Sequence, residues 1–295
     1  MARTILQLVQ DASTELGLPS VSLVINNSDD TVKQLLAFAH RTLDTLQSQF
    51  DWPQLQKEHT FATVASTANY GLPGDFDRFL FRSQWDRSNQ WELAGPLSPQ
   101  EWQVYKSGTT VSFPRKRYRI KGYADDQFFL DPTPDAADTM AFEYITGTTI
   151  KPTSWAASTS FAASSYCFND GNIYQTTAGG TTGSTAPTHT SGSSSDGGVS
   201  WTFVTGSGAA TGGTAYNRFL ADTDVPLLNG DIVNLGMQWR WLRLKRLQYV
   251  DIKADYDAMV FRETSSFKSA PTLDMARKQA RLFLSPANVA DTGFG

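Results

Sequence analysis

Two segments near the start of the chain repeat apolar residues every three or four positions, which is the period of an amphipathic helix. The first covers residues 3–16, and the Gly17 and Pro19 that follow are residues that end a helix. The second covers residues 29–50, with Ser28 as its expected N-cap. The pattern predicts two helices, each burying one face. The apolar stripe of the second is Val32, Leu35, Leu36, Ala39, Leu43, Leu46 and Phe50.

A longer helical pattern runs from residue 231 to residue 261. At 1.5 Å per residue, an uninterrupted helix of this kind is roughly 45 Å long. Trp239 lies on a stripe that can pack on the two N-terminal helices, whereas Trp241 lies on the other side of the helix. An exposed patch of Trp and Leu is costly, so we expect the second stripe to meet a neighbouring copy of the chain. The expected interface with another subunit or a partner protein comprises Trp239, Trp241, Arg243, Arg246, Phe267 and Phe294.

Between these helical regions, residues 54–150 have the pattern of short β-strands. Strand-like stretches such as RFLFRSQW, RYRIKGY, QFFLDP and MAFEYIT are separated by Gly and Pro. One short helix fits residues 99–106, with Ser98 as its cap, and another fits residues 272–285. We therefore expect an α+β fold, with a helical core, a long C-terminal helix and a β-sheet layer.

The middle of the chain breaks this pattern. Between Lys151 and Arg218 there is no Lys, Arg or Glu, and the only charged residues are Asp170 and Asp196. Sequence so rich in Gly, Ser and Thr is typical of a disordered linker. Linkers rarely carry so many aromatic residues, however, and a small folded all-β module is the favoured interpretation. The aromatic residues are Trp155, Phe161, Tyr166, Phe168, Tyr174, Trp201 and Phe203.

These changes of pattern predict a discontinuous core. Residues 1–152 and 213–270 form it, the β-rich module at residues 153–212 is inserted, and residues 271–295 are a C-terminal tail. The end of the tail is small and polar, and it buries too little surface to offset about 1–2 kcal/mol of backbone entropy per residue. We expect the segment after Phe267 to become ordered on a partner.

Bulk composition narrows the functional classes. Of 295 residues, 40% are hydrophobic and 18% are charged, which suits a packed core. The net charge of -4 gives no overall basic excess of the kind that marks a nucleic-acid binder. A single cysteine, Cys167, excludes an intrachain disulfide framework and a thiolate metal cluster. The sequence has no apolar run of about 18 residues, so no membrane-spanning helix is expected.

Candidate catalytic and metal-binding groups are few, and no cofactor is expected. Asp125 with Asp126 and Asp222 with Asp224 are pairs that acid–base catalysis could use, although capping and salt bridges explain the second pair more simply. The histidines have no metal-binding spacing; they are His40, His59 and His189. Basic residues cluster at 115–121 and 240–246, which indicates a solvated face, salt bridges between subunits or contact with DNA.

The order of several motifs resembles a known family. DWPQLQ closes an early helix, YGLPGDFDRF follows a strand, and QFFLDPTPDAADTMAFEYIT spans a strand, a proline turn and a second strand. FLADTDVPLLNGDIVNLGMQWRWLRLKRL then enters the long helix. Together they resemble the head-to-tail adaptor proteins, or tail accessory factors, of short-tailed bacteriophages. The resemblance covers residues 1–150 and 214–285.

That resemblance implies a structural virion protein and not an enzyme. Such adaptors form a dodecameric ring at the head–tail junction and are assembled in the host cytoplasm. The ring binds the portal protein on one side and tail nozzle or tail fibre proteins on the other, and the genomic DNA passes through its lumen. No membrane partner is implied.

The insertion has a resemblance of its own. Trp155, Tyr174 and Trp201, with a turn at Gly171 and another at Gly197, resemble small carbohydrate-binding modules of chitinases and phage tail proteins. This implies a host glycan as a partner of an aromatic surface, although the three rings can equally form the core of the module. A glycan-binding tail protein and a cell-wall hydrolase are therefore the alternative functions.

Overall fold

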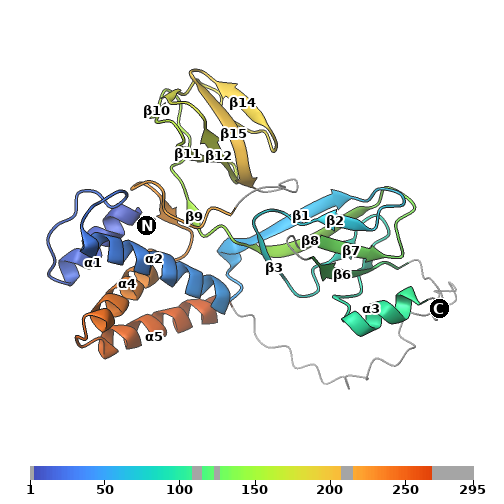
Figure 1. Cartoon of the computed structure of the whole chain (residues 1–295), viewed down its shortest axis with the longest axis horizontal. Coiled ribbons are helices and arrows are strands. Elements are labelled where there is room, and N and C mark those ends of the chain that lie inside the picture. Colours follow the sequence, from blue (N-terminus) through green and yellow to red (C-terminus); the bar gives the residue numbers. More distant parts are fainter. Residues whose placement is uncertain (1–2, 108–114, 123–126, 207–214, 268–295) are drawn as a thin grey trace. The chain divides into compact units, whose positions relative to one another are not determined.

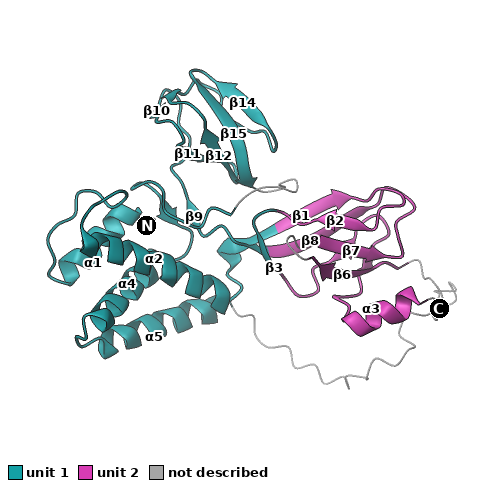
Figure 2. Ribbon diagram, viewed as in Figure 1, with its two compact units in different colours: residues 1–57, 74–78, 145–269 teal, residues 58–73, 79–144, 270–295 magenta. Residues whose placement is uncertain are grey.

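The computed structural model describes residues 3–107, 115–122, 127–206 and 215–267, and this part of the chain is a mixed α+β protein (Figure 1). The predicted fold class is confirmed. The chain divides into two compact units (Figure 2). The first unit consists of residues 1–57, 74–78 and 145–269, and the second of residues 58–73, 79–144 and 270–295.

The described residues of the first unit form four α-helices, and the other three pack on α4 (Gly230–Leu244). The other three are α1 (Ile5–Glu15), α2 (Asp30–Gln49) and α5 (Val250–Phe267). The stop that the sequence predicted after the first helix is confirmed, because Gly17 has a φ of 68° and the Leu18 amide donates to the Ser13 carbonyl at 2.8 Å. Most of the apolar stripes of α1 and α2 is buried, with Leu8, Leu35 and Leu43 fully inaccessible, whereas Leu36 and Phe50 are only half-buried.

The N-cap of α2 is Asp29, and not Ser28 as the sequence suggested. The Asp29 carboxylate accepts a hydrogen bond from the Thr31 amide at 2.7 Å. The Asn27 side chain in turn accepts from the Asp29 amide at 2.8 Å. A carboxylate at the positive end of the helix adds a charge–dipole attraction that a serine hydroxyl lacks, which explains the shift by one residue.

The prediction of one continuous helix across residues 231–261 is wrong, because the structure has two helices there, α4 and α5. Arg246 adopts a φ of 58°, and the Leu247 amide donates to the Leu242 carbonyl at 2.9 Å. The Arg246 amide donates to the Arg243 carbonyl at 3.2 Å. These two bonds form a Schellman cap, which ends α4 and turns the chain into α5. The left-handed position is usually a glycine, so an arginine there gives no stop signal in the sequence.

Helices α2 and α4 approach closely at Gly236. A Cβ atom built on this glycine would lie 2.4 Å from Thr42 Cγ2 and 2.7 Å from Thr42 Oγ1. Thr42 is fully buried and cannot easily turn away, because its hydroxyl donates to the Phe38 carbonyl at 2.7 Å and accepts from Arg240 Nη1 at 3.0 Å. The close approach therefore requires glycine.

Gly236→Ala should lower the free energy of unfolding by about 1–3 kcal/mol, because overpacking outweighs the roughly 1 kcal/mol that alanine gains in helix propensity. Urea denaturation followed by circular dichroism measures the change. Thr42→Ala in the same chain removes the clashing methyl group, so the double variant should be less destabilised than the sum of the two single variants. Simple additivity would argue against the steric account.

His40 on α2 is a half-buried hydrogen-bond acceptor. Its Nε2 atom accepts from the Phe219 amide at 3.0 Å, and its ring stacks on the Phe219 ring at 5.3 Å. Burial and the nearby Arg218 guanidinium lower the pKa of His40 to about 4, although Asp44 acts in the opposite direction. The neutral imidazole is therefore the form that this contact requires.

The first unit should lose stability as the pH falls from about 6.5 to 4. The pKa of His40 is lower in the folded chain than in the unfolded chain, so its contribution is complete above the unfolded value and is lost as protons bind to the unfolded state. After allowance for solvent screening, the loss is up to about 2 kcal/mol. His40→Gln should flatten this part of the stability–pH curve, measured by urea denaturation. An unchanged slope would assign the effect to another group.

Two sheets pack face to face in the region of residues 56–146. One has the order β1 (Gln56–Ala62), β8 (Thr139–Thr146), β4 (Trp85–Asp86) and β5 (Trp91–Glu92), and β3 (Phe76–Phe79) also pairs with β8. The other has the order β2 (Asn69–Gly71), β7 (Gln127–Asp131) and β6 (Arg117–Lys121). Aromatic rings fill the space between the sheets, with Phe142 and Phe128 stacked at 5.6 Å. The predicted helix over residues 99–106 is confirmed as α3 (Pro99–Lys106), capped by Ser98.

The charge-poor segment folds into β-structure. A four-stranded sheet has the order β11 (Tyr166–Asn169), β12 (Asn172–Thr176), β15 (Val199–Gly206) and β14 (Ser193–Asp196), and β10 (Ser160–Phe161) pairs with β13 (Gly180–Thr181). Asp170 and Gly171 both have positive φ angles, as a tight hairpin turn between β11 and β12 requires. The segment has its own buried cluster: Phe161, Cys167, Tyr174, Val199 and Trp201.

The two ends of this β-rich segment lie next to each other. Strand β9 (Ile150–Lys151) precedes it and pairs antiparallel with β16 (Val225–Pro226), which follows it. The hydroxyl groups of Thr153 and Thr223 form a further hydrogen bond of 2.6 Å. The chain therefore enters and leaves the segment at neighbouring points.

Candidate interaction surfaces

The two tryptophans of α4 are buried within the chain. Trp239 is 9% exposed and Trp241 is 8% exposed. Lys245 lies over the Trp241 ring, with its Nζ atom 5.5 Å from the centroid. Trp241 therefore does not leave the unpartnered apolar stripe that the sequence suggested, because the chain turns back after Leu244 and α5 packs on α4. A role for either indole at a subunit interface stays a prediction.

The basic residues near the end of α4 fall into two groups. Arg240 is buried, and its guanidinium donates to the hydroxyl groups of Thr42 at 3.0 Å and Thr45 at 3.2 Å. Arg243 and Arg246 are exposed, and their place in an interface stays a prediction. Phe267 is also exposed and lies edge-on to Trp52 at 6.5 Å, whereas Phe294 lies outside the described residues.

The basic run at residues 115–121 is partly internal. The Lys116 ammonium is buried between Asp86 at 2.9 Å and Asp138 at 2.6 Å. Arg117 lies over the Tyr105 ring at 3.7 Å and forms an ion pair with Asp131 at 3.7 Å. These two cations hold the second unit together and do not present charge to a nucleic acid.

The carboxylates Asp222 and Asp224 hold backbone in place. Asp222 accepts from the Val24 and Ile25 amides at 3.1 and 2.8 Å. Asp224 is buried and accepts from the Tyr216 hydroxyl at 2.9 Å and from the backbone amide of Leu220 at 2.8 Å. Burial raises the pKa of Asp224, although these hydrogen bonds oppose the shift. The other candidate pair, Asp125 with Asp126, lies outside the described residues.

Metal-binding groups and membrane-spanning helices can be searched for only among the described residues. Among the described residues, no group of three or more His, Cys, Asp or Glu side chains is placed to hold a metal ion. None of the helices in the described ranges combines the length and apolar character needed to cross a bilayer.

The three aromatic residues proposed for glycan recognition lie mainly in the interior. Tyr174 and Trp201 are both fully buried in the cluster of the β-rich segment. Trp155 packs against that cluster and is half-buried, and its indole donates to the Asp196 carboxylate at 2.8 Å. This placement fits the interpretation of the rings as the core of the module.

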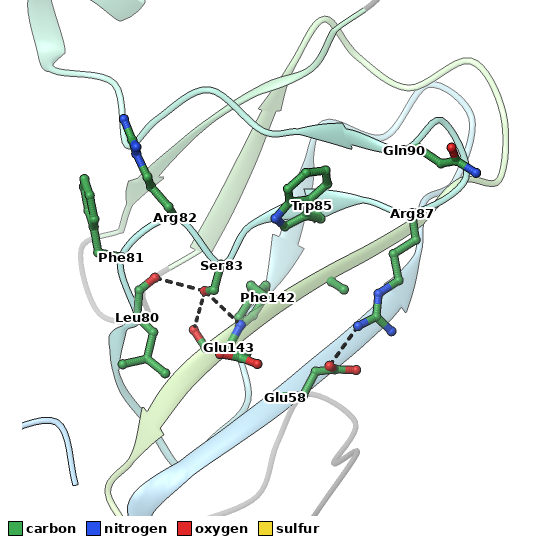
Figure 3. A pocket seen from close by; sticks show the side chains of 11 residues that line it. Glu58, Leu80, Phe81, Arg82, Ser83, Trp85, Arg87, Gln90, Phe142 and Glu143 are labelled. Carbon is green, nitrogen blue, oxygen red and sulfur yellow. Dashed lines mark hydrogen bonds and ion pairs between the residues drawn. The ribbon is translucent and has the colours of Figure 1, made fainter. Parts of the chain in front are cut away.

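The second unit carries an open groove that the sequence did not indicate (Figure 3). Its volume is about 560 Å³, and Phe81 and Trp85 line it with exposed fractions of 85% and 44%. Ala141 lies directly opposite Trp85 in the strand register, which leaves space beside the indole. Glu58 and Arg87 form an ion pair of 2.8 Å across another part of the groove.

The alternation of RFLFRSQW could not show which rings face solvent. Strands β3 and β4 are separated by a turn in which Arg82 has a φ of 61°. The Ser83 hydroxyl donates to the Leu80 carbonyl at 2.9 Å, and the Leu80 amide donates to the Glu143 carbonyl at 3.1 Å. The turn interrupts the alternation of side chains, so the period of the sequence does not assign Phe81 or Trp85 to a face.

A comparison with protein families gives one match. The family model described as SU10 adaptor protein matches residues 3–178, more than half of the chain. The matched range includes α1, α2, both sheets of the second unit and the beginning of the β-rich segment. No curated protein matches the chain significantly. The helices, the sheets and this match together place the chain in the SU10 adaptor protein family, as a structural adaptor protein of a bacteriophage.

Proposed function

We propose that this adaptor forms a ring that joins the portal protein of a short-tailed bacteriophage to its tail and encloses the path of the DNA. The observation that carries the proposal is the family match over residues 3–178. In this proposal the protein is assembled in the host cytoplasm and acts at the head–tail junction. Its other partners are tail nozzle or tail fibre proteins.

Exposed apolar side chains on the first unit support a role in assembly. Monomeric proteins seldom expose large apolar patches that have no binding function. Among the described residues of the first unit, Leu23 and Leu220 are exposed elsewhere, but most such side chains lie between the end of α4 and the end of α5: Leu244, Leu247, Val250, Phe261 and Phe267. The C-terminal tail, residues 271–295, lies outside the described residues, and we propose that it docks on the portal.

The β-rich segment is, in our proposal, an inserted module that decorates the ring. Its separate buried cluster and the pairing of β9 with β16 at its base support this role. A host glycan remains a second proposed partner, on the strength of the resemblance to carbohydrate-binding modules. Binding through Tyr174 or Trp201 would require these rings to leave the core, so Trp155 is the residue to test in a glycan titration.

Mass photometry of the chain mixed with its portal protein tests the proposal. We expect one complex that carries many copies of the adaptor. A variant in which a short Gly/Ser bridge replaces residues 153–212 should form the same complex, and a variant that ends at Phe267 should not bind the portal. If the full-length chain leaves the portal unbound, the proposed function is wrong. If only the variant without the module fails, the module is part of the ring.

A further inference from the structure

The turn between α4 and α5 combines exposed apolar and basic side chains. We call residues 243–250 the α4–α5 turn. Leu244, Leu247 and Val250 are each more than half exposed, at 53%, 52% and 56%. Arg243 and Arg246 are exposed as well, and neither forms an ion pair with a described residue. Apolar side chains with arginine are the composition of a protein interface core and its rim.

A surface with the opposite charge lies along α5. At 100° per residue, one side of the helix gathers residues that are all exposed, opposite the buried Tyr256. This α5 outer face consists of Asp251, Ala254, Asp255, Ala258 and Phe261, with Arg262 at the end away from the turn. Phe261 is 72% exposed, and the two alanines leave a shallow apolar strip beside it. Asp251 and Asp255 form no ion pair with a described residue.

The two surfaces are opposite in charge and both carry exposed apolar side chains. Two arginines of the turn would face the two aspartates, and its leucines would face the alanines next to Phe261. Ala258 lies about 12 Å along α5 from Val250, so the turn of the same chain does not cover this part of the strip. The rest of the chain carries a net charge of -7 once Arg243, Lys245 and Arg246 are set aside from the total of -4. A second copy therefore offers the acidic partner that a basic turn requires.

We infer that the α4–α5 turn of one copy packs on the α5 outer face of a second copy, a contact that rests on the proposed ring. It joins two different surfaces, so each copy keeps one surface of each kind free for further neighbours. Repetition of such a contact gives a ring when the rotation closes. Three partly exposed aliphatic side chains are too few for membrane anchoring, and they add nothing to phosphate binding, so protein is the favoured partner.

The backbone of the turn supports this inference independently. Arg246 holds a left-handed conformation that glycine adopts with less strain. A strained residue is often retained at a functional site, where its side chain is needed. Arg246→Gly should therefore leave the melting temperature unchanged or raise it, and it should weaken the association of the copies at least tenfold. A purely structural role for Arg246 predicts no change in association.

Charge reversal is the first test, read by mass photometry with the portal protein present. Arg243→Glu with Arg246→Glu should weaken assembly at least tenfold, and so should Asp251→Lys with Asp255→Lys. All four changes in one chain should restore the complex, because the ion pairs are then reversed as a set. Lys253→Glu is the control, because its partner Asp257 lies on its own helix and off the α5 outer face. Assembly that none of the reversals weakens overturns the inference.

Disulfide trapping is the second test. Leu247→Cys with Ala258→Cys cannot close within one chain, because the two positions are farther apart than a disulfide spans. The native Cys167 is fully buried and does not compete. We expect a ladder of trimers and larger species on a non-reducing gel, whereas bands that stop at the dimer would show a symmetric contact and overturn the inference. A wild-type ring that gives no ladder also overturns it but leaves the proposed function intact. A wild-type chain that remains monomeric on the portal overturns both.

Discussion

Lys116→Met is expected to lower the free energy of unfolding of the second unit by about 3–5 kcal/mol. The Lys116 side chain is 6% exposed and holds two carboxylates, of which Asp86 is 1% exposed and Asp138 is 16% exposed. Methionine fills a similar volume but leaves these negative charges buried without their counter-ion. Burial alone raises the pKa of Asp86, yet hydrogen bonds from Asn89 and Lys116 outweigh it and hold the pKa below its usual value.

Urea denaturation of the variant measures this loss, with Arg87→Met as the matched control. The Arg87–Glu58 pair in the same unit has side chains that are 50% and 46% exposed, so its removal should cost about 0–1 kcal/mol. Adding Asp86→Asn to Lys116→Met removes one of the two carboxylates left without a counter-ion. The double variant should therefore recover part of the lost free energy of unfolding. Equal effects of Lys116→Met and Arg87→Met would contradict the buried-charge account.

Trp201→Ala should unfold the β-rich module while the helices of the first unit remain folded. Trp201 is fully buried, and its ring lies edge-on to Phe161 at 5.0 Å. Removal of a buried Trp side chain costs about 3–5 kcal/mol. The buried cluster of the module is small, so this loss is comparable with the whole stability of a domain of its size.

Hydrogen exchange with mass spectrometry locates the effect. Exchange should rise in peptides from residues 153–206 and stay unchanged in α1, α2 and α4. Trp85→Ala is the control, because this indole is 44% exposed and its truncation should change exchange little. A rise that extends to the helices would mean that the module and the helices of the first unit unfold together, against the proposed insertion.

The helices could be predicted where local signals and packing agree. The apolar stripes, Gly17 after α1 and the Ser98 cap of α3 all depend on neighbouring residues, and a short window of sequence contains them. The end of α4 could not be predicted, because Arg246 takes the place of the usual glycine and the tertiary packing of α5 on α4 stabilises the turn. Local propensity gives way to packing at such positions.

Which residues of α4 and α5 remain exposed could be predicted even less well, because exposure depends on tertiary structure. The helical period correctly separated Trp239 and Trp241 onto different sides of α4, but it could not show that further elements cover both sides. The residues left exposed are Leu244, Leu247 and Phe261, which the continuous-helix interpretation did not distinguish from the core. Likewise, the charge of Lys116 suggested a surface, because the two carboxylates that bury it come from distant parts of the sequence.

The pairing of β9 with β16 has a consequence for the evolution and engineering of this adaptor. The strands before and after the β-rich segment are hydrogen-bonded to each other. The position at which the chain enters α4 therefore does not depend on the length or fold of the segment between these strands. If the segment is an inserted module as proposed, we expect that a gene segment encoding a different compact domain can replace it while the flanking fold is kept. The same position is suited to displaying a foreign antigen or enzyme on the phage particle, in as many copies as the virion holds of the adaptor.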